Sequence, residues 1–270
     1  DGAAAQNTEK TPAAAPAATQ LSVQLVRERY DDRSIKLERH VAQDASFNFV
    51  NHGAWTMWDR AGNLVAKGEY IQGRRQGEWI RYYASGEVKE SLDKEAGAEV
   101  SPVEQTIDPL AGTAFEGFRT PIASKAKFVD DHIIGTWSVA DSEGRPLFAV
   151  DLAKDVPNGK ATWYFANGRK HREIDFKNGI VDGLWQEWNE SGSVTREDRY
   201  IEGCRLAEVT LTNDAGAKNA EGVYLYAKDN VRVELDWWSG LMEVEAASTD
   251  GKAMKQGKWL FYHDDGSKRY

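Results

Sequence analysis

The sequence predicts an all-β protein, an elongated antiparallel meander of β-hairpin repeats with a period of about 24 residues. Glycines and aromatic residues recur in one frame: Gly, Trp two residues later, an aromatic residue after five, and further glycines after nine and twenty. Sixteen of the 24 glycines and seven of the ten tryptophans fall on these positions. The residues after the second Gly alternate in character, as in Leu64, Ala66, Gly68 and Tyr70, which is typical of a half-buried strand.

The copies of the frame are recognised by a glycine followed two residues later by a tryptophan. They are Gly53 with Trp55, Gly77 with Trp79, Gly135 with Trp137, Gly183 with Trp185, and Gly257 with Trp259. A weaker copy begins at Gly159. The starts at 53 and 77, and those at 135, 159 and 183, lie 24 residues apart.

Each copy reads as one hairpin. The segments 188–192 and 262–266 are typical of a strand that enters a short loop closed by a glycine with positive φ. Asn178-Gly179 and Asp182-Gly183 are typical of the return turn between copies. Hairpins joined end to end make a meander.

The chain divides by composition into four parts. Residues 1–20 are rich in Ala and Pro and lack aromatics, which predicts a disordered tether. Residues 21–97 are expected to form an N-terminal hairpin cap and a first repeat block, and residues 98–127, with three prolines, an inserted loop. Residues 128–270 form the expected second block, with eroded copies at 204–256.

The aromatic residues suggest both a core and a candidate binding face. The tryptophans two residues after each first glycine are expected to be the buried spine of a single sheet. The aromatics five residues after it could form an exposed binding face: Trp58, Tyr82, Tyr164, Trp188 and Tyr262. An odd separation places the two sets on opposite faces of a regular strand, or on the same face if a bulge separates them.

Composition excludes several classes of function. An excess of 43 acidic over 34 basic residues argues against nucleic-acid binding, and no apolar run is long enough for a transmembrane helix. The single cysteine, Cys204, rules out an intrachain disulfide framework. No metal site, cofactor or catalytic motif is predicted; residues 130–132, two Asp and a His, are interpreted as a polar turn.

The spacing Gly-x-Trp-x-x-Tyr-x-x-x-Gly, followed by Tyr-x-x-Gly-x-x-x-Gly, resembles the bacterial variant of the MORN repeat. The resemblance covers about residues 50–97, 128–203 and 257–270. It implies a strand-rich scaffold for contact with proteins or membrane surfaces, with no catalytic residues. This variant also occurs in proteins described as antitoxins.

The sequence therefore predicts a non-enzymatic repeat scaffold for protein binding or assembly. The alternatives are a carbohydrate- or cell-wall-binding module that uses the exposed aromatics, and an antitoxin-like partner of a toxin. The tether predicts an exported protein, periplasmic or at the cell surface, with the cytoplasm as the alternative. Self-association is expected through the C-terminal sheet edge, because the N-terminal hairpin carries more charge.

Overall fold

The computed structural model describes residues 22–83, 116–226, 230–247, 253–263 and 265–269. These residues form eighteen strands and no helix. The strands are β1 (Gln24–Arg29), β2 (Ile35–Gln43), β3 (Phe49–Trp58), β4 (Leu64–Ile71), β5 (Arg74–Tyr83), β6 (Ile122–Val129), β7 (His132–Ala140), β8 (Pro146–Ala153), β9 (Val156–Tyr164), β10 (Lys170–Lys177), β11 (Ile180–Trp188), β12 (Val194–Ile201), β13 (Cys204–Thr212), β14 (Lys218–Leu225), β15 (Asn230–Asp236), β16 (Leu241–Ala247), β17 (Met254–Tyr262) and β18 (Lys268–Arg269).

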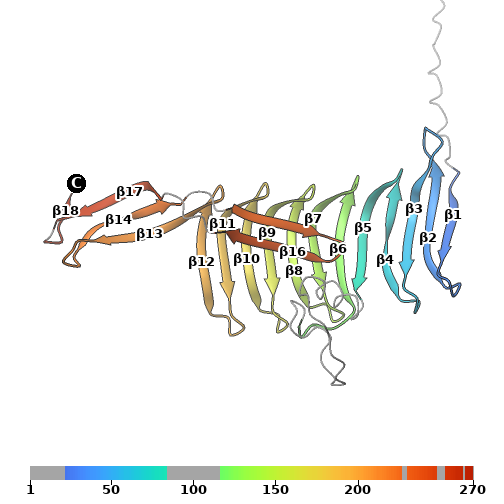
Figure 1. Cartoon of the computed structure of the whole chain (residues 1–270), viewed down its shortest axis with the longest axis horizontal. Coiled ribbons are helices and arrows are strands. Elements are labelled where there is room, and N and C mark those ends of the chain that lie inside the picture. The colour runs from blue at the N-terminus through green and yellow to red at the C-terminus, as the bar shows by residue number, and fades with distance from the viewer. Residues whose placement is uncertain (1–21, 84–115, 227–229, 248–252, 264, 270) are drawn as a thin grey trace, which may run out of the picture.

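Sixteen of these strands form one long antiparallel sheet, as the sequence predicts (Figure 1). Their order follows the chain from β1 to β14 and then continues with β17 and β18. The two expected repeat blocks are joined directly, because β5 pairs with β6 from Gly77 opposite Phe128 to Tyr83 opposite Ile122.

The turns at the two long edges of the sheet are of two kinds. At one edge two residues with positive φ connect the strands, as Gln72 (φ 50°) and Gly73 (φ 82°) do between β4 and β5, which suits a type I′ turn. At the other edge a longer loop is closed by the Asp59 carbonyl, which accepts a hydrogen bond from the Gly62 N–H at 3.1 Å. We call these the short-turn edge and the long-turn edge.

The first glycine of the frame forms a bulge rather than a turn. Gly183 lies inside β11 with φ 131°, so Asp182-Gly183 is not the expected return turn. The register with β10 shifts here, and the Leu184 N–H donates to Asp175 at 3.0 Å. A Cβ on Gly183 would lie 2.7 Å from the Asp175 Cβ, which explains why glycine is needed.

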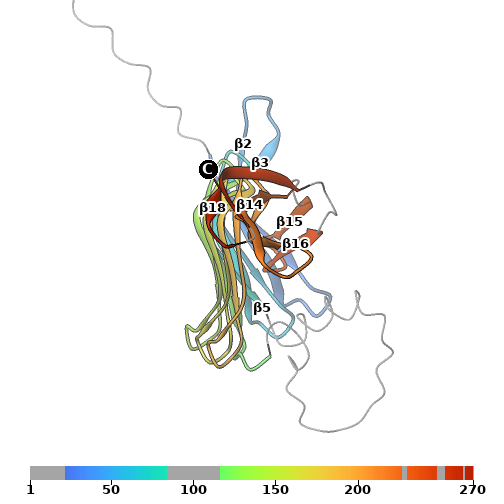
Figure 2. The ribbon, with the colours of Figure 1, turned by 90° about the vertical axis from the view of Figure 1, so that its left-hand side faces the viewer.

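A second layer covers one face of the sheet. Strands β15 and β16 form a separate hairpin that lies across the middle of the long sheet (Figures 1 and 2). Trp237, at the tip of this hairpin, makes edge-to-face contacts with Trp79 and Phe128 at centroid distances of 6.2 and 5.2 Å. The core therefore lies between the sheet and this hairpin. We call the covered side the tryptophan face and the other the opposite face.

Two segment predictions need correction. Residues 122–127, expected in the inserted loop, belong to β6, because they pair with both β5 and β7. Residues 204–256, expected as eroded copies in the array, are divided: β13 and β14 stay in the sheet, whereas β15 and β16 leave it. The expected tether, and residues 84–115 of the first block and the inserted loop, lie outside the described residues.

The N-terminal cap forms the expected hairpin, with β1 paired to β2 from Gln24 opposite Val41 to Arg29 opposite Ile35. At the far end the sheet changes direction. Strands β12 and β13 pair at only three positions, and β13, β14, β17 and β18 turn away from the main sheet (Figure 1).

Candidate binding surface

The expected tryptophan spine is buried in the middle of the sheet and half-buried at its ends. Trp79, Trp137 and Trp185 are at most 1% exposed, whereas Trp55 and Trp259 are half-buried. The Trp137 indole N–H donates to the buried Ser124 hydroxyl at 2.9 Å. The three fully buried rings hold the scaffold together and are not available to a ligand.

The five aromatics proposed as a binding face are half-buried: Trp58, Tyr82, Tyr164, Trp188 and Tyr262. Strand alternation places them on the opposite face, near the long-turn edge. Cations lie over two of them, Lys170 at 5.9 Å from the Trp188 ring centroid and Lys218 at 4.9 Å from that of Tyr262. They are therefore part of the surface without being fully exposed.

Three tryptophans outside the repeat frame also take part in packing. Trp163 lies on the tryptophan face, with its ring stacked 6.4 Å from Phe148. Trp237 is 7% exposed and Trp238 is 43% exposed, both on the covering hairpin. Two adjacent tryptophans, 237 and 238, do not fit the alternation of a half-buried strand. This feature of the sequence could have indicated that the segment leaves the repeat array.

The frame did not reveal a row of exposed aliphatic side chains on the opposite face. Each member lies beside a two-residue turn of the short-turn edge: Ile71 (47% exposed), Val129 (39%), Val156 (41%) and Ile201 (48%). The side chain before Val129 is Phe128 and the one before Ile201 is Tyr200, both 1% exposed and buried on the tryptophan face. Alternation therefore turns the aliphatic side chains to the opposite face. We call these four residues the aliphatic row.

Between the aliphatic row and the aromatics, the opposite face is polar and internally paired. Lys160 Nζ lies 3.0 Å from Glu173 Oε1 and 2.8 Å from Asp175 Oδ1. Hydrogen bonds to Asp175 and Glu173 raise the pKa of Lys160. Burial opposes ionisation of Glu173, but hydrogen bonds from Lys170 and Lys160 hold the pKa of Glu173 below its usual value.

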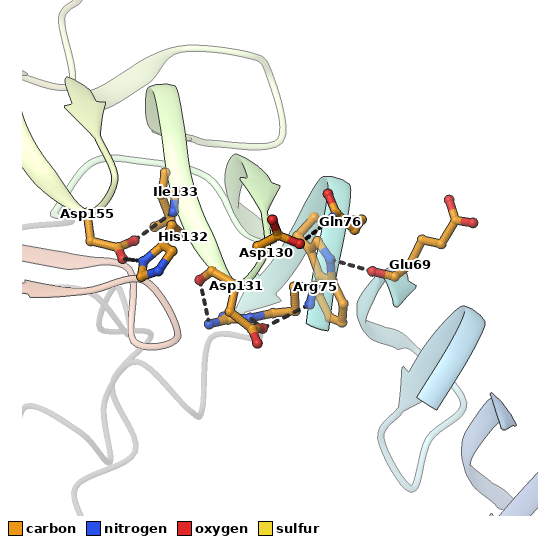
Figure 3. A network of polar contacts seen from close by, with 9 residues as sticks. Glu69, Arg75, Gln76, Asp130, Asp131, His132, Ile133 and Asp155 are labelled. Atoms are coloured by element: carbon orange, nitrogen blue, oxygen red, sulfur yellow. Dashed lines mark hydrogen bonds and ion pairs between the residues drawn. The ribbon is translucent and has the colours of Figure 1, made fainter. Parts of the chain in front are cut away.

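A polar network fixes the turns beside Val129 (Figure 3). Arg75 donates to Asp131 Oδ1 from its backbone N–H at 2.9 Å and from Nε at 3.1 Å. His132 Nδ1 lies 2.6 Å from Asp155 Oδ2, and the Ile133 N–H donates to the same carboxylate at 2.6 Å. The Asp130 and Asp131 backbones have φ of 51° and 71°. Residues 130–132 therefore begin with the polar turn that the sequence predicts.

Next to this network, a cavity of about 290 Å³ separates the sheet from the covering hairpin. Phe128, Trp137, Trp237, Asp131 and Asp155 are among its lining residues. The carboxylates of Asp131 and Asp155 are already engaged by Arg75, His132 and the Ile133 N–H. The cavity is thus a gap in the packing between two layers whose polar groups are mostly paired within the chain.

The described residues contain no group of three or more His, Cys, Asp or Glu placed to hold a metal ion. Within the same residues, no helix is long and apolar enough to cross a membrane. Cys204 is half-buried at the start of β13.

These features define a class of protein, a β-hairpin repeat scaffold built on one extended sheet. The particular repeat is similar to the MORN repeat variant, whose family model matches residues 75–92 and 157–178. The second match spans β9, β10 and the turn that follows, which supports a relationship to MORN-repeat proteins. No curated protein matches the chain significantly.

Proposed function

We propose that this protein is a non-enzymatic scaffold that binds another protein through the opposite face of its sheet. The observation that carries the proposal is the aliphatic row, in which four exposed Ile and Val side chains repeat along one edge. Exposed apolar side chains scattered singly are ordinary, but several of them on the same face beside one edge of a rigid sheet favour a contact site.

The row follows four of the five two-residue turns of the short-turn edge, and the turn between β10 and β11 carries the exposed Lys177 instead. Successive hairpins advance by two strands, or roughly 10 Å, so the row extends over several tens of ångströms. Repeat arrays commonly bind partners along such extended surfaces. The paired charges beside the row leave few unsatisfied groups to desolvate when a partner covers it.

The test is partner capture from native extract with the full chain, followed by affinity measurement with the captured protein. The variant Val129→Lys with Val156→Lys places two charges in the row and should weaken binding by more than tenfold. Val23→Lys is the matched control, because Val23 is 45% exposed but lies before β1 and outside the row. Unchanged affinity in the row variant, with circular dichroism preserved, would refute the proposal.

The half-exposed rings on the long-turn edge support a second candidate, a carbohydrate-binding module. Trp58 and Trp188 are surface aromatics of the kind that stack on sugar rings. A glycan array should then give a saturable signal that is lost in Trp58→Ala combined with Trp188→Ala. A signal unaffected by these changes would remove the aromatics from the binding site.

Two narrower proposals depend on the biological context. Export is tested by locating the full-length protein in cell fractions, and recovery in the cytoplasm alone would contradict it. An antitoxin-like role is supported by the resemblance alone and is tested by a toxin gene beside this one, whose toxicity this protein should suppress.

A further inference from the structure

The sheet separates between β12 and β13. Pairing holds at Arg199 with Leu206, Tyr200 with Arg205, and Ile201 with Cys204, and then stops. A cleft of about 620 Å³ begins there, lined by residues from both strands. The main sheet and the C-terminal strands diverge from this point (Figure 1).

Beyond the last pair, the register would place two acidic residues opposite each other. If pairing continued past Arg199 and Leu206, the next pairs would be Asp198 with Ala207 and then Glu197 with Glu208. Like charges directly opposite each other destabilise an antiparallel pair. Both glutamates instead line the cleft.

Neither glutamate is neutralised by a described basic side chain. Glu197 accepts a hydrogen bond from the Gln186 amide at 2.7 Å, and the described residues supply no ion pair to Glu208. The nearby Arg205 lies 3.8 Å from Asp198, whose carboxylate also accepts from Arg196 at 2.6 Å. The cleft thus lies between two separated strands, β12 and β13, and carries two carboxylates, those of Glu197 and Glu208, that no described basic side chain pairs with.

Backbone groups also face the cleft. The Arg205 carbonyl accepts from the Tyr226 N–H at 2.9 Å and so points toward β14. Because direction alternates along an antiparallel strand, the N–H and C=O of Glu208 point toward β12. On β12, Ile201 closes the two-residue turn, so the same alternation directs the groups of Glu197 toward β13.

We propose that this cleft binds an extended basic segment of a partner protein, which adds as a strand to the free edge of β12. A Lys or Arg of the segment lies between Glu197 and Glu208. The segment pairs with β12 because β12 continues the main sheet, whereas β13 turns away. Strand addition of this kind draws affinity from main-chain hydrogen bonds and specificity from side chains. The inference rests on the proposed protein-binding function and names a partner segment for it.

The probe is a short synthetic peptide of alternating valine and threonine with one central lysine. The control peptide has glutamate in place of this lysine. The lysine peptide should bind saturably to the full chain and slow hydrogen exchange at the Glu197 amide of β12. The glutamate peptide should bind about tenfold more weakly, since two attractive contacts become repulsive. Equal binding of the two peptides, or none, would overturn the proposal.

Two variants separate the backbone and charge contributions. Glu197→Pro removes the N–H that faces the cleft, at an edge position where proline is tolerated, and should abolish peptide binding. Glu197→Gln with Glu208→Gln should remove the preference for lysine, whereas Glu190→Gln in an exposed turn should leave it unchanged. Full binding to the proline variant would contradict strand addition.

Two controls show whether something other than a partner segment occupies the cleft, and whether the cleft inference fails separately from the proposed scaffold function. Amide protection at Glu197 that rises with protein concentration in the absence of peptide would show a second copy in the cleft and would overturn the assignment to a partner. A captured partner that binds through Val129 and Val156 but ignores Glu197→Pro and Glu208→Gln would refute the cleft inference while leaving the scaffold function intact. Loss of all partner binding in the Val129→Lys and Val156→Lys variant would support the scaffold function, and the cleft inference is decided by the peptide alone.

Discussion

The indole of Trp79 occupies the space that a side chain at Gly68 would need. Gly68 lies where the β4–β5 register shifts, between Lys67 and Glu69, and a Cβ at Gly68 would be 2.1 Å from the Trp79 indole Cδ2. The same relationship recurs at Gly222, where a Cβ would be 2.4 Å from the Trp259 Cδ2. Glycine is needed at these two strand positions for ring packing, because neither has a positive φ.

Gly68→Ala should therefore destabilise the protein by about 1–3 kcal/mol, the usual cost of overpacking a well-filled site. Chemical denaturation measures the effect. In a double-mutant cycle, Gly68→Ala should cost little when Trp79→Leu has already removed the ring. An additive cycle would show that the indole contact is not the cause.

Tyr83→Phe should loosen the covering hairpin. The Tyr83 hydroxyl donates to the carbonyls of Trp237 and Trp238 at 3.2 and 2.9 Å, so its loss should cost about 1 kcal/mol. Hydrogen exchange should accelerate in β15 and β16 more than in β7. Tyr82→Phe is the matched control, because Tyr82 immediately precedes Tyr83 and lies on the opposite face. Equal acceleration by both variants would contradict this role.

Asp141 should make stability depend on pH. It is 5% exposed, and although burial opposes ionisation, hydrogen bonds from Arg145 and the Arg119 N–H hold the pKa of Asp141 below its usual value. A depressed folded-state pKa gives a contribution that is complete above the unfolded value and is lost as the pH falls through the folded value.

Asp141→Asn should thus lower the free energy of unfolding at neutral pH by about 1–3 kcal/mol and flatten its decline in acid. Denaturation at a series of pH values measures both. Asp214→Asn, in an exposed turn, should leave the profile unchanged. If the free energy of unfolding of the Asp141→Asn variant fell with decreasing pH as steeply as that of the wild type, another group would be responsible for the pH dependence.

The C-terminal edge should be the more associative end of the sheet. Within the part of the chain that the structure describes, β18 pairs only with Phe261 and Tyr262, and Met254 and Phe261 are 59% and 38% exposed. At the other end, Arg27 and Glu38 form an ion pair at 2.5 Å. Met254→Lys with Phe261→Lys should reduce association in sedimentation velocity, whereas Phe47→Lys, at an 80% exposed turn residue, should not. Association unaffected by the first variant would exclude this edge.

The repeat frame predicted the sheet because its information is local. Turn glycines such as Gly62 and Gly73, and the alternation between them, specify strands and their antiparallel order. The frame also predicted that Trp79, Trp137 and Trp185 form the core. It left open which face the second aromatic set occupies, and strand alternation in the structure places that set opposite the core.

The missed features depend on contacts between distant residues. Val231 and Leu235 read as strand residues, but their departure from the array is decided by the packing of Trp237 on Trp79 and Phe128. The aliphatic row was missed because its members lie outside the glycine and aromatic positions. The cleft was missed because the end of the β12–β13 pairing, and the placing of Glu197 and Glu208 beside it, are visible only once the register is known.

The central claim is that the opposite face binds another protein, and site-specific photo-crosslinking in the native cell tests it most directly. A photoreactive residue is placed in turn at Val129, Val156 and Ile201, and at Glu243, an exposed position on the covering hairpin. The three positions of the aliphatic row should crosslink to the same protein, and Glu243 should not. Crosslinks from Glu243 alone, or none from the row, would contradict it.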